Sequence, residues 1–484
     1  MRFGLDVGTT RTIAAAVDRG NYPIVTVEDT FGDSHDFIPS VVAMKDGHIV
    51  SGWDAVEIGQ DHPTFTRSFK RLLTHPNVTE ATPVRLGEHT ITIGELLQSF
   101  ARTVVKALED YQAQLGDTSA VEVVIGVPAN AHSAQRLLTM SAFSTAGATV
   151  VGLVNEPSAA AFEYTHRHAR TLNSKRQSIV VYDLGGGTFD ASLIRIDGTH
   201  HDVASSIGLS RLGGDDFDEI LLERALSAAG REYDAFGKRA KNKLLDESRN
   251  AKEALVPQSR RLILEIGDKD ITVPVKDFYD AATPLIEQTL NIMEPLVGGS
   301  DLKDSDIAGI YLVGGASALP LVSRLLRERF GRRVHRSPFP SGSTAVGLAI
   351  AADPDSGFHL RDRVARGIGV FREWDSGRAV SFDPLIAPDA KSSTVATRRY
   401  KAAHNVGWFR FVEYSTMNND GSPGDISLLS EVKIPFDPLI TDVDTAEITA
   451  FEGPEVEETI TVTNNGVASI NIKVIGGSTF EHTI

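Results

Sequence analysis

Residues able to do chemistry are concentrated in a short stretch of the chain. Residues 180–194 read VVYDLGGGTFDASLI and place the glycines of positions 185–187 between Asp183 and Asp190, at the end of a strand-like run. Because glycine is unfavourable inside a strand, three in succession indicate a place where the backbone comes close to another group. Backbone amides in such a turn can form a concave site for an anion.

A related stretch lies near the N-terminus. Residues 3–17, FGLDVGTTRTIAAAV, also carry a strand that ends in an aspartate, a turn of glycine and threonine, and a second strand. Asp6 corresponds to Asp183, and Gly8 corresponds to Gly185. Two such hairpins indicate two similar lobes, each contributing half of one site.

Two further glycine turns occur in SRLGGDDFDEILLERAL (210–226) and IYLVGGASALPLVSRLL (310–326). In the second of these, Leu319, Val322 and Leu326 continue at helical spacing, so a helix N-terminus would add its positive end to the amides of the turn. We expect the glycines of the four turns to bind phosphate: Gly8, Gly185, Gly186, Gly187, Gly213, Gly214, Gly314 and Gly315.

Carboxylates beside these turns would repel phosphate unless a cation lay between them. Mg²⁺ prefers oxygen ligands and keeps several of its waters, so Asp6, Asp183 and Asp190 are predicted to hold Mg²⁺ through those waters. The alternative for one turn is an ordinary tight turn capped by aspartate, but four turns with matching ends favour a site. No GxxxxGK[ST] or GxGxxG pattern occurs, which excludes a Walker A loop and the common dinucleotide turn.

The composition is that of a globular protein with more than one domain: 484 residues, 41% of them hydrophobic and 23% charged. A formal net charge of −16 argues against nucleic acid or a membrane as the main partner, because both require a basic face. The absence of cysteine excludes disulfides and thiol catalysis. No apolar run reaches the ~18 residues of a membrane span, so we expect a cytoplasmic protein. Nothing calls for an obligate oligomer, so we expect a monomer.

Other segments are interpreted as structural. A capping box formed by Thr92 and Glu95 opens an amphipathic pattern that Gly116 ends, which predicts a helix. His200 and His201 lack companion ligands at metal-site spacing, so we expect them in a loop.

The pattern becomes β after residue 365. ETITVTNNGVASINIKV, residues 458–474, alternates apolar and polar residues on both sides of an Asn-Gly turn and predicts a hairpin. Prolines and glycines punctuate the rest of this region at short intervals, which indicates a small β-sandwich.

Eight motifs follow one another along the chain: GLDVGTTRT, IPSVVA, FKRLL, GVPANA, NEPSAAA, DLGGGTFD, LGGDDFD and LVGGASALP. With them the chain resembles the 70-kDa heat-shock protein (DnaK-type) chaperone family, strongly over residues 1–355 and more loosely beyond. DLGGGTFD and NEPSAAA are specific signals, whereas GTT also occurs in sugar kinases.

The resemblance implies an α/β fold, an actin-like two-lobed ATPase domain (a duplicated ribonuclease H-like fold) around a nucleotide cleft, followed by a small all-β sandwich domain. The expected boundaries are residues 1–355 for the ATPase domain, 356–365 for the linker and 366–484 for a peptide-binding β-domain. The implied reaction is slow hydrolysis of ATP to ADP and phosphate, with Mg²⁺ and, by the same resemblance, K⁺.

The same resemblance assigns roles to single residues. Lys70 matches a lysine that helps to position the attacking water, although a solvated lysine is the alternative. Glu156 is placed near the Mg²⁺–phosphate site, and its charge also suits a helix N-terminus. Asp190 helps to orient water. The hydroxyl donors to phosphate are Thr9, Thr10 and Thr188.

Lys252 matches the lysine that contacts the ribose, but the nucleoside pocket departs from the family. Arg249 stands where the family has Glu, while Glu253 and Ala318 replace arginines that often enclose the adenine. Base stacking must therefore come from other residues or be weaker. Two further residues, Pro128 and Arg136, match a family relay toward the second domain; a loop proline and a surface arginine are the alternative.

The β-domain is expected to bind unfolded or extended peptide segments, by resemblance. The residues expected to line its site are Ile368, Val370, Phe371 and Trp408, for which sandwich core is an equal alternative. J-domain co-chaperones and nucleotide exchange factors are the other implied partners. The sequence ends at Ile484 with no helical lid, so we expect fast peptide exchange.

Three functions remain open at this point. The first is an ATP-dependent chaperone of the 70-kDa heat-shock type. The second is a nucleotide-gated scaffold for one dedicated partner with negligible ATPase activity, which the altered nucleoside pocket and the charged linker GFHLRDRV (357–364) keep open. The third is a small-molecule kinase of the actin superfamily, against which DLGGGTFD, NEPSAAA and the β region argue.

Overall fold

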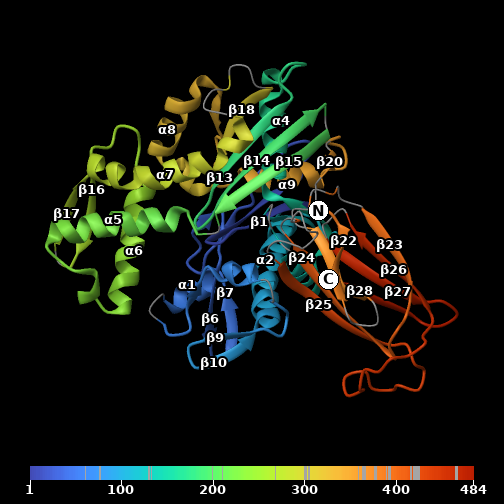
Figure 1. Cartoon of the computed structure of the whole chain (residues 1–484). Coiled ribbons are helices and arrows are strands. Elements are labelled where there is room, and N and C mark those ends of the chain that lie inside the picture. The colour runs from blue at the N-terminus through green and yellow to red at the C-terminus, as the bar shows by residue number, and fades with distance from the viewer. Residues whose placement is uncertain are drawn as a thin grey trace. The chain divides into compact units, whose positions relative to one another are not determined.

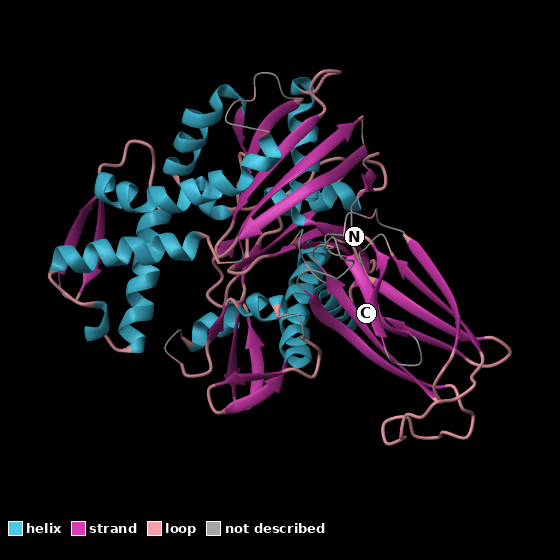
Figure 2. Ribbon diagram, viewed as in Figure 1, coloured by secondary structure: helices cyan, strands magenta, loops and turns pink. Residues whose placement is uncertain are grey.

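The computed structural model describes the chain except for a set of short segments: 60–61, 76–77, 129–130, 132, 199, 210, 268, 299–301, 303–305, 358, 362–366, 375–378, 389, 391–393, 415–416, 418–425, 464–466 and 484. Helices and strands both contribute, so the fold is mixed α/β (Figure 2). The chain divides into two compact units. Unit 1 comprises residues 1–70, 83–129 and 143–360, and unit 2 comprises residues 71–82, 130–142 and 361–484.

The first sheet of unit 1 has five strands in the order β12-β11-β1-β2-β5. β1, β11 and β12 are parallel, and β2 is antiparallel to β1. The strand bounds are β1 Arg2–Val7, β2 Arg11–Ala16, β5 Ile38–Pro39, β11 Glu122–Val127 and β12 Thr149–Asn155.

The second sheet of unit 1 repeats this plan with six strands in the order β19-β18-β13-β14-β15-β20. An antiparallel hairpin of β13 and β14 again lies beside parallel strands, so both hairpins expected from the sequence are present. The strand bounds are β13 Ser178–Leu184, β14 Phe189–Asp197, β15 His200–Leu209, β18 Ile307–Val313, β19 Val334–Arg336 and β20 His359–Arg361.

The interpretation of His200 and His201 as loop residues is wrong, because both open β15 and pair with β14. His201 is fully buried and lies 2.7 Å from the Thr165 hydroxyl. The lack of companion metal ligands does not indicate a loop, because a histidine can also be an ordinary buried residue of a strand.

Helices of unit 1 are labelled in Figure 1. The helix bounds are α1 Trp53–Ile58, α2 Ile93–Gln114, α3 Ser133–Thr145, α4 Glu156–His168, α5 Gly214–Ala229, α6 Lys238–Glu253, α7 Val275–Val297, α8 Pro320–Phe330 and α9 Ser343–Ala352. The predicted capping box opens α2, with Thr92 and Glu95 bonding reciprocally. Short 3₁₀ segments are η1 Phe69–Thr74, η2 Ala169–Thr171, η3 Tyr233–Ala235, η4 Gly315–Ala318 and η5 Gly331–Arg333.

Four small sheets complete unit 1. They are formed by β3 Val27–Glu28 with β4 Ser34–His35, by β6 Val41–Lys45 with β7 His48–Ser51 and β8 Thr66–Arg67, by β9 Pro83–Leu86 with β10 His89–Thr92, and by β16 Arg261–Ile266 with β17 Lys269–Pro274.

Small residues let α4 and α9 pack closely. A Cβ at Gly347 would overlap with the backbone carbonyl of Ala159, and one at Gly4 would overlap with the backbone of α9. α4 is buried from Pro157 to Thr165, because one side packs with α9 on the first sheet and the other packs on the second sheet. These two helices therefore join the sheets whose hairpins carry the candidate site.

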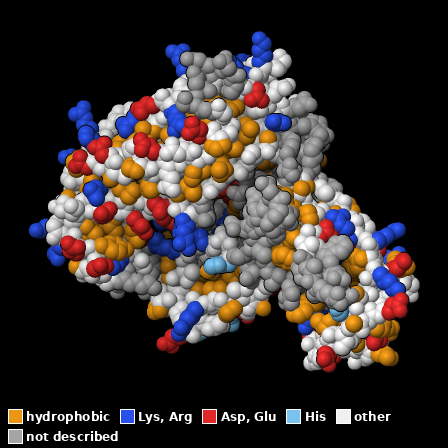
Figure 3. All heavy atoms as spheres, viewed as in Figure 1, with side chains coloured by type: hydrophobic (Ala, Val, Ile, Leu, Met, Phe, Trp, Pro, Cys, Tyr) orange, Lys and Arg blue, Asp and Glu red, His pale blue; other side chains and the backbone are white. Residues whose placement is uncertain are grey.

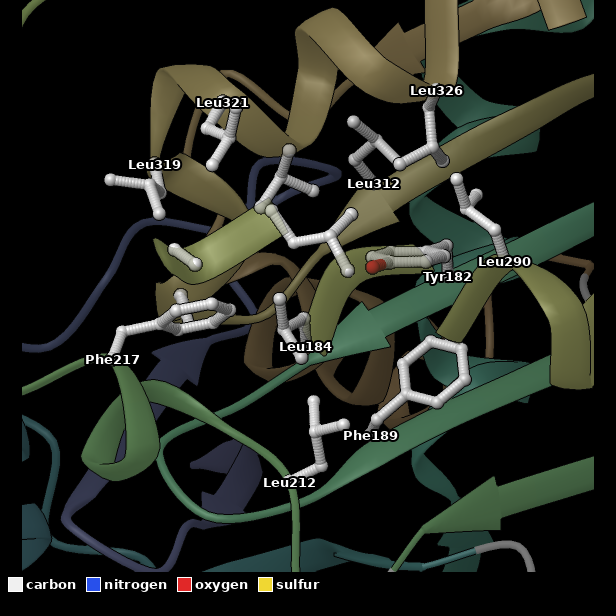
Figure 4. Close-up of a cluster of buried hydrophobic side chains, with 14 of the residues drawn as sticks. Tyr182, Leu184, Phe189, Leu212, Phe217, Leu290, Leu312, Leu319, Leu321 and Leu326 are labelled. Atoms are coloured by element: carbon white, nitrogen blue, oxygen red, sulfur yellow. The ribbon is translucent and has the colours of Figure 1, made fainter. Parts of the chain in front are cut away.

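The largest hydrophobic cluster supports the second sheet. Figure 4 shows Tyr182, Leu184 and Phe189 of β13 and β14 among side chains from α5, α7 and α8. The Tyr182 and Phe189 ring centroids are 4.8 Å apart, and the Tyr182 hydroxyl is hydrogen-bonded to Thr289 at 2.7 Å. Close packing of this kind fixes the strand ends from which the glycine turns extend.

Unit 2 contains two four-stranded antiparallel sheets, with the orders β22-β21-β24-β25 and β23-β26-β27-β28. Buried side chains of both sheets form one hydrophobic cluster. The bounds are β21 Gly367–Trp374, β22 Ala379–Ile386, β23 Val395–Lys401, β24 Val406–Tyr414, β25 Ile426–Pro435, β26 Glu455–Val462, β27 Ala468–Val474 and β28 Thr479–Thr483. β26 and β27 form the predicted hairpin, whose central turn lies outside the described residues.

Of the expected linker, residues 356–365, positions 358 and 362–365 lie outside the described residues, and His359–Arg361 form β20. Within the described ranges, no helix is long and apolar enough to cross a membrane.

Candidate functional site

The two aspartates of the longer hairpin face each other across it. β13 and β14 pair Asp183 with Asp190, and β13 and β18 pair Asp183 with Val313. Gly314 follows β18 with φ 82°, and a Cβ there would overlap with the Asp183 carboxylate and the Leu184 carbonyl. Glycine is therefore required at this close approach, which lies at the carboxyl ends of parallel strands, where α/β proteins commonly bind ligands.

Backbone hydrogen bonds join the central glycine turn to the next one. The Gly214 amide donates to the Gly185 carbonyl at 2.9 Å, and the Asp215 amide donates to the Gly186 carbonyl at 2.7 Å. A Cβ at Gly213 would overlap with the same turn. Because α5 begins at Gly214, its positive end lies beside the triple glycine, an arrangement that favours an anion.

The N-terminal hairpin meets this turn from the other sheet. A Cβ at Gly186 would lie 2.9 Å from the Thr10 methyl group, and one at Gly8 would overlap with the Arg11 carbonyl. Thr9 lies in the same tight turn. The structure thus brings together turns that are far apart in the sequence, and the predicted residues in them are Asp6, Gly8, Thr9, Thr10, Asp183, Gly185, Gly186, Gly187, Thr188, Asp190, Gly213, Gly214, Gly314 and Gly315.

Lys70 and Glu156 form an ion pair beside these turns. The Lys70 amine donates to the Glu156 carboxylate at 2.8 Å, and their side chains are 13% and 16% exposed. Lys70 lies in η1, and Glu156 begins α4 with Pro157 next to it in the first turn. The alternative of a solvated lysine is therefore wrong, because Lys70 is held in place by a nearly buried partner.

Burial and mutual repulsion control the charges of the site. Burial, then the negative charge of Glu156, raise the pKa of Asp6 to about 7, and the same causes raise the pKa of Asp190 to about 7. Burial and three neighbouring carboxylates raise the pKa of Asp183 well above its usual value. Although burial alone would lower the pKa of Lys70, Glu156 and Asp6 raise it.

The carboxylates therefore favour a cation that enters between them. Asp6, Asp183 and Asp190 are only partly exposed, and their pKa values are raised first by burial and then by neighbouring carboxylates, whose negative charge a divalent ion would offset. Within the described part of the chain, no three His, Cys, Asp or Glu side chains are close enough to hold a metal directly. This donor set suits Mg²⁺, which keeps its waters and needs few direct protein ligands.

Comparison with known proteins decides the family. The profile of the Hsp70 protein family matches residues 2–402. The chain belongs to the Hsp70 family. Among its relatives, the chaperone protein DnaK of Mycoplasmopsis agalactiae is 29% identical over 366 residues, 72% of this chain and 58% of that protein. The chaperone protein HscA homolog of Burkholderia mallei is 32% identical over 371 residues, 73% of this chain and 58% of the relative. The matched region thus spans less than two thirds of these relatives.

In this Hsp70-family chain, Lys252 already has protein partners. Its amine donates to the Gly214 carbonyl at 2.7 Å and lies 2.5 Å from the Asp218 carboxylate. Arg249, on the same helix, is paired with Asp218 at 3.2 Å and with Asp215 at 3.0 Å. These contacts hold the start of α5 against α6, so Lys252 positions the glycine turn whether or not it also contacts a ribose.

Two ion pairs that sequence reasoning missed reach α6 from distant segments. Arg11 is paired with Glu253 at 2.7 Å, and Arg67 is paired with Asp246 at 2.6 Å. Their partners are separated by 242 and 179 residues, so no local pattern could reveal them. Glu253 stands where the family has an arginine, and its partner Arg11 directly follows the predicted phosphate-binding threonines.

The two predicted relay residues lie in different units. Pro128 follows β11 in unit 1, and Arg136 lies in α3 within unit 2. Arg136 is buried, and its guanidinium donates to the Ala131 carbonyl at 3.2 Å. The alternative of a surface arginine is therefore wrong, while the relay role stays a prediction.

The four residues expected to line a peptide site separate by burial. Ile368 and Val370 are each 1% exposed and belong to the core of unit 2, as the alternative interpretation expected. Phe371 and Trp408 are 39% and 43% exposed. The Lys433 amine lies 5.2 Å from the centre of the Trp408 ring. Phe371 and Trp408 are therefore the two of the four that a peptide could reach in this conformation.

Proposed function

We propose that this chain is an ATP-dependent chaperone of the Hsp70 type, in which hydrolysis of ATP controls the binding of extended peptide segments. One observation carries the proposal: the nearly buried Lys70–Glu156 ion pair lies among three carboxylates of raised pKa, beside turns where glycine alone fits. Membership of the Hsp70 family and the chaperone names of its relatives support the same function.

The proposed architecture follows from the repeated hairpins. The two sheets of unit 1 would form the two lobes of a duplicated actin-like ATPase fold, with α4 and α9 between them. The two sheets of unit 2, which share one hydrophobic cluster, would form the peptide-binding sandwich. Residues 1–355, 356–365 and 366–484 are the proposed domain and linker boundaries.

The site would catalyse hydrolysis mainly by holding its reactants in place. Amides of the glycine turns and the hydroxyls of Thr9, Thr10 and Thr188 would bind the phosphate chain. Lys70 would donate to the terminal phosphate and its water, and Asp190 would accept from that water and orient it. The water oxygen bonds to the terminal phosphorus, the bond to the ADP oxygen breaks, and the water proton passes to phosphate. Asp6, Asp183 and Asp190 would hold Mg²⁺, which would supply positive charge to the phosphates.

Single-turnover ATP hydrolysis tests the proposal. Lys70→Ala should lower the hydrolysis rate constant at least about 100-fold, since it removes the charge that positions the reactants. The matched control is Lys269→Ala, because Lys269 is exposed on β17 and distant from the site in the sequence; it should leave the rate unchanged. An unchanged rate in Lys70→Ala would rule out the proposed catalytic role.

A nucleotide-gated scaffold with negligible ATPase activity remains a second candidate. The observation that favours it is the engagement of Lys252, Arg249 and Glu253 with protein partners, since these residues stand where a family member would contact the nucleoside. ATP binding without hydrolysis in the native chain, together with one stoichiometric partner in a pull-down, would favour the scaffold. Membership of the Hsp70 family leaves the small-molecule kinase without support.

Peptide segments, J-domain co-chaperones and exchange factors are the proposed partners of the whole molecule. Phe371 and Trp408 are the residues we propose to contact peptide, because they combine apolar area with exposure in unit 2. Trp408→Ala should weaken binding of a leucine-rich extended peptide, measured by fluorescence anisotropy. Unchanged affinity would move the proposed site to another part of unit 2.

A further inference from the structure

One arginine beside the phosphate turns has no role in the catalytic proposal. Arg11 directly follows Thr10 and begins β2, and its backbone carbonyl lies close to Gly8. Thr10 in turn contacts the triple glycine, since a Cβ at Gly186 would lie 2.9 Å from its methyl group. The backbone of Arg11 is therefore part of the turn that we propose to bind phosphate.

The side chain of Arg11 extends to the other side of the same site. Its guanidinium is paired with the Glu253 carboxylate at 2.7 Å. Glu253 follows Lys252, whose amine donates to the Gly214 carbonyl at 2.7 Å. The Gly214 amide in turn donates to the Gly185 carbonyl of the central turn at 2.9 Å. The guanidinium therefore lies between two segments that flank the glycine turns, the N-terminal hairpin and the end of α6.

The ion pair of Arg11 is more exposed than the other ion pairs of the site. The Arg11 and Glu253 side chains are 36% and 45% exposed, whereas the paired side chains of Lys70 and Lys252 are 13% and 8% exposed. An exposed ion pair stabilises a protein little, because water solvates both charges when they separate. Arg11 can therefore leave Glu253 with little loss of stability when a stronger anion is present.

Arg11 uses only part of its hydrogen-bonding capacity. A guanidinium carries five N–H donors, and the pair with Glu253 engages one nitrogen, Nη2. Within the described part of the chain, Arg11 has no second ion pair or side-chain hydrogen bond. The ring of Phe37 covers one face of the guanidinium, with its centre 4.6 Å from Cζ, and Phe37 is itself packed against Trp53. The guanidinium is thus oriented by its neighbours and keeps N–H groups for another acceptor.

Positive charge is accessible beside α6. In Figure 3, Lys and Arg side chains gather in the middle of the visible face, to the right of the place where Figure 1 labels α6. The ion pairs of this helix include Arg11, Arg67 and Arg249. Because the whole chain has a formal net charge of −16, a local group of cations is where an anion would be attracted.

The phosphate chain of a nucleotide fits Arg11 better than its base does. Arg11 adjoins Thr9 and Thr10, whose hydroxyls are proposed to bind phosphate. Phe37 already occupies one face of the guanidinium, so the edge that carries the N–H groups is the more available surface. Arginine binds phosphate oxygens through two parallel hydrogen bonds, and a phosphate chain carries more negative charge than one carboxylate.

We propose that Arg11 binds the phosphate chain of the nucleotide and that Glu253 competes with the nucleotide for this guanidinium. The inference rests on the proposed ATPase function and adds a residue to its site. Glu253 holds the guanidinium until phosphate replaces the carboxylate as its partner, and the exposed carboxylate is then hydrated. Glu253 therefore lowers the affinity for nucleotide.

Titration calorimetry of the full-length chain with ATP in Mg²⁺ tests the proposal. Arg11→Ala should weaken ATP binding by about tenfold or more, because charge-assisted hydrogen bonds to phosphate are lost. Glu253→Gln should tighten ATP binding by about threefold or more, because it removes the competitor of phosphate. An ion pair that only held α6 in place would be broken by both changes, so weaker binding in both variants would overturn the proposal.

Two control variants remove the same charges at other positions. Arg261→Ala changes an exposed residue of β16, and Glu247→Gln changes α6 six residues before Glu253. Each should change the dissociation constant of ATP by less than about twofold, because charges that are distant from the phosphate are screened by salt. Effects in the controls as large as those of Arg11→Ala and Glu253→Gln would assign the changes to net charge and overturn the proposal.

Tripolyphosphate, which has no base, separates a contact with phosphate from a contact with adenine. Displacement of a fluorescent ATP analogue should show that Arg11→Ala weakens tripolyphosphate binding as much as ATP binding. Loss of affinity for ATP alone would assign Arg11 to the base and overturn the proposal, as would failure of tripolyphosphate to displace the analogue from the native chain. A native chain that binds no ATP would overturn the proposed ATPase function as well, whereas unchanged ATP affinity in Arg11→Ala would overturn this inference alone.

Discussion

At the scale of single residues, the site depends on positions where only glycine fits beside a carboxylate. Gly314 has a left-handed backbone, and a side chain there would displace Asp183. Such strain persists only where the surroundings fix the backbone, and it is concentrated at functional sites. The position of Asp183 is thus determined by the absence of a side chain on the neighbouring strand.

Gly314→Ala should therefore reduce both stability and nucleotide binding. We expect a loss of about 1–3 kcal/mol in the free energy of unfolding, measured with urea, because the new methyl group is strained and moves Asp183. Gly230→Ala is the matched control, since Gly230 also has positive φ but no atom near its Cβ position. If Gly230→Ala lost as much stability and as much ATP affinity as Gly314→Ala, this explanation would be contradicted.

The raised pKa of Asp190 predicts how stability depends on pH. Because its folded pKa of about 7 exceeds the ordinary aspartate pKa of 3.8, the folded state binds more protons than the unfolded state between these values. This contribution to stability is fully present below about pH 4 and is lost as the pH rises through about 7.

In EDTA, the free energy of unfolding of the native chain should therefore fall from pH 5 to pH 8. In Asp190→Asn this fall should be smaller by about 1 kcal/mol or more. Urea unfolding at both values measures the difference. Asp277→Asn, at an exposed position of α7, should show no such trend. The same pH profile in Asp190→Asn and in the native chain would contradict the raised pKa.

The sequence predicts these residues well because their signals are local. Asp6, Asp183 and the glycine runs are recognisable within a few positions, and both hairpins are present where expected. Partners that lie far apart in the sequence could not be predicted. The pairing of Arg11 with Glu253 depends on how α6 packs against a hairpin 242 residues away, which no local pattern encodes.

At the scale of elements, a buried carboxylate joins the helices and the second sheet. Glu163 of α4 is fully buried and accepts hydrogen bonds from the Tyr311 hydroxyl of β18 and the Ser343 hydroxyl of α9, both at 2.7 Å. Arg167, one turn later on α4, is its ion-pair partner at 2.5 Å. One side chain thus fixes α4 relative to two other elements.

Glu163→Ala should destabilise unit 1 by about 3–5 kcal/mol, because it removes one member of a buried, hydrogen-bonded ion pair. Glu109→Ala, at an exposed position of α2, should change the unfolding free energy by less than about 0.5 kcal/mol. Thermal or urea unfolding measures both variants. If Glu163→Ala lowered the unfolding free energy by less than about 1 kcal/mol, the Tyr311 and Ser343 hydroxyls would be forming hydrogen bonds with water instead.

Sequence patterns predict elements whose signal is periodic and miss those set by context. The capping box of Thr92 and the hairpin of residues 458–474 are confirmed, since helical and alternating patterns are strong there. His200 and His201 were placed in a loop but begin a strand. Their pairing with β14 is decided by the sheet, which overrides the weak preference of a polar dipeptide.

At the scale of the whole molecule, binding at the turns should stabilise the folded chain. A ligand that binds only the folded state adds about 2.7 kcal/mol of stability at 100 times its Kd. ATP should therefore raise the Tm in Mg²⁺ and have little effect in EDTA, because the carboxylates of the site repel phosphate without the cation. Differential scanning fluorimetry measures the shift. An equal rise in Tm in EDTA would contradict a metal-dependent site.

The central claim is that nucleotide at these turns controls peptide binding by unit 2. The most direct measurement is the dissociation rate of a fluorescent, leucine-rich extended peptide, followed by anisotropy with ATP–Mg²⁺ and then with ADP–Mg²⁺. We expect faster release with ATP than with ADP in the native chain. In Lys70→Ala we expect release to stay fast after ATP is added, because hydrolysis no longer restores the ADP state. Peptide that fails to bind, or that leaves at the same rate with both nucleotides, would contradict the chaperone function.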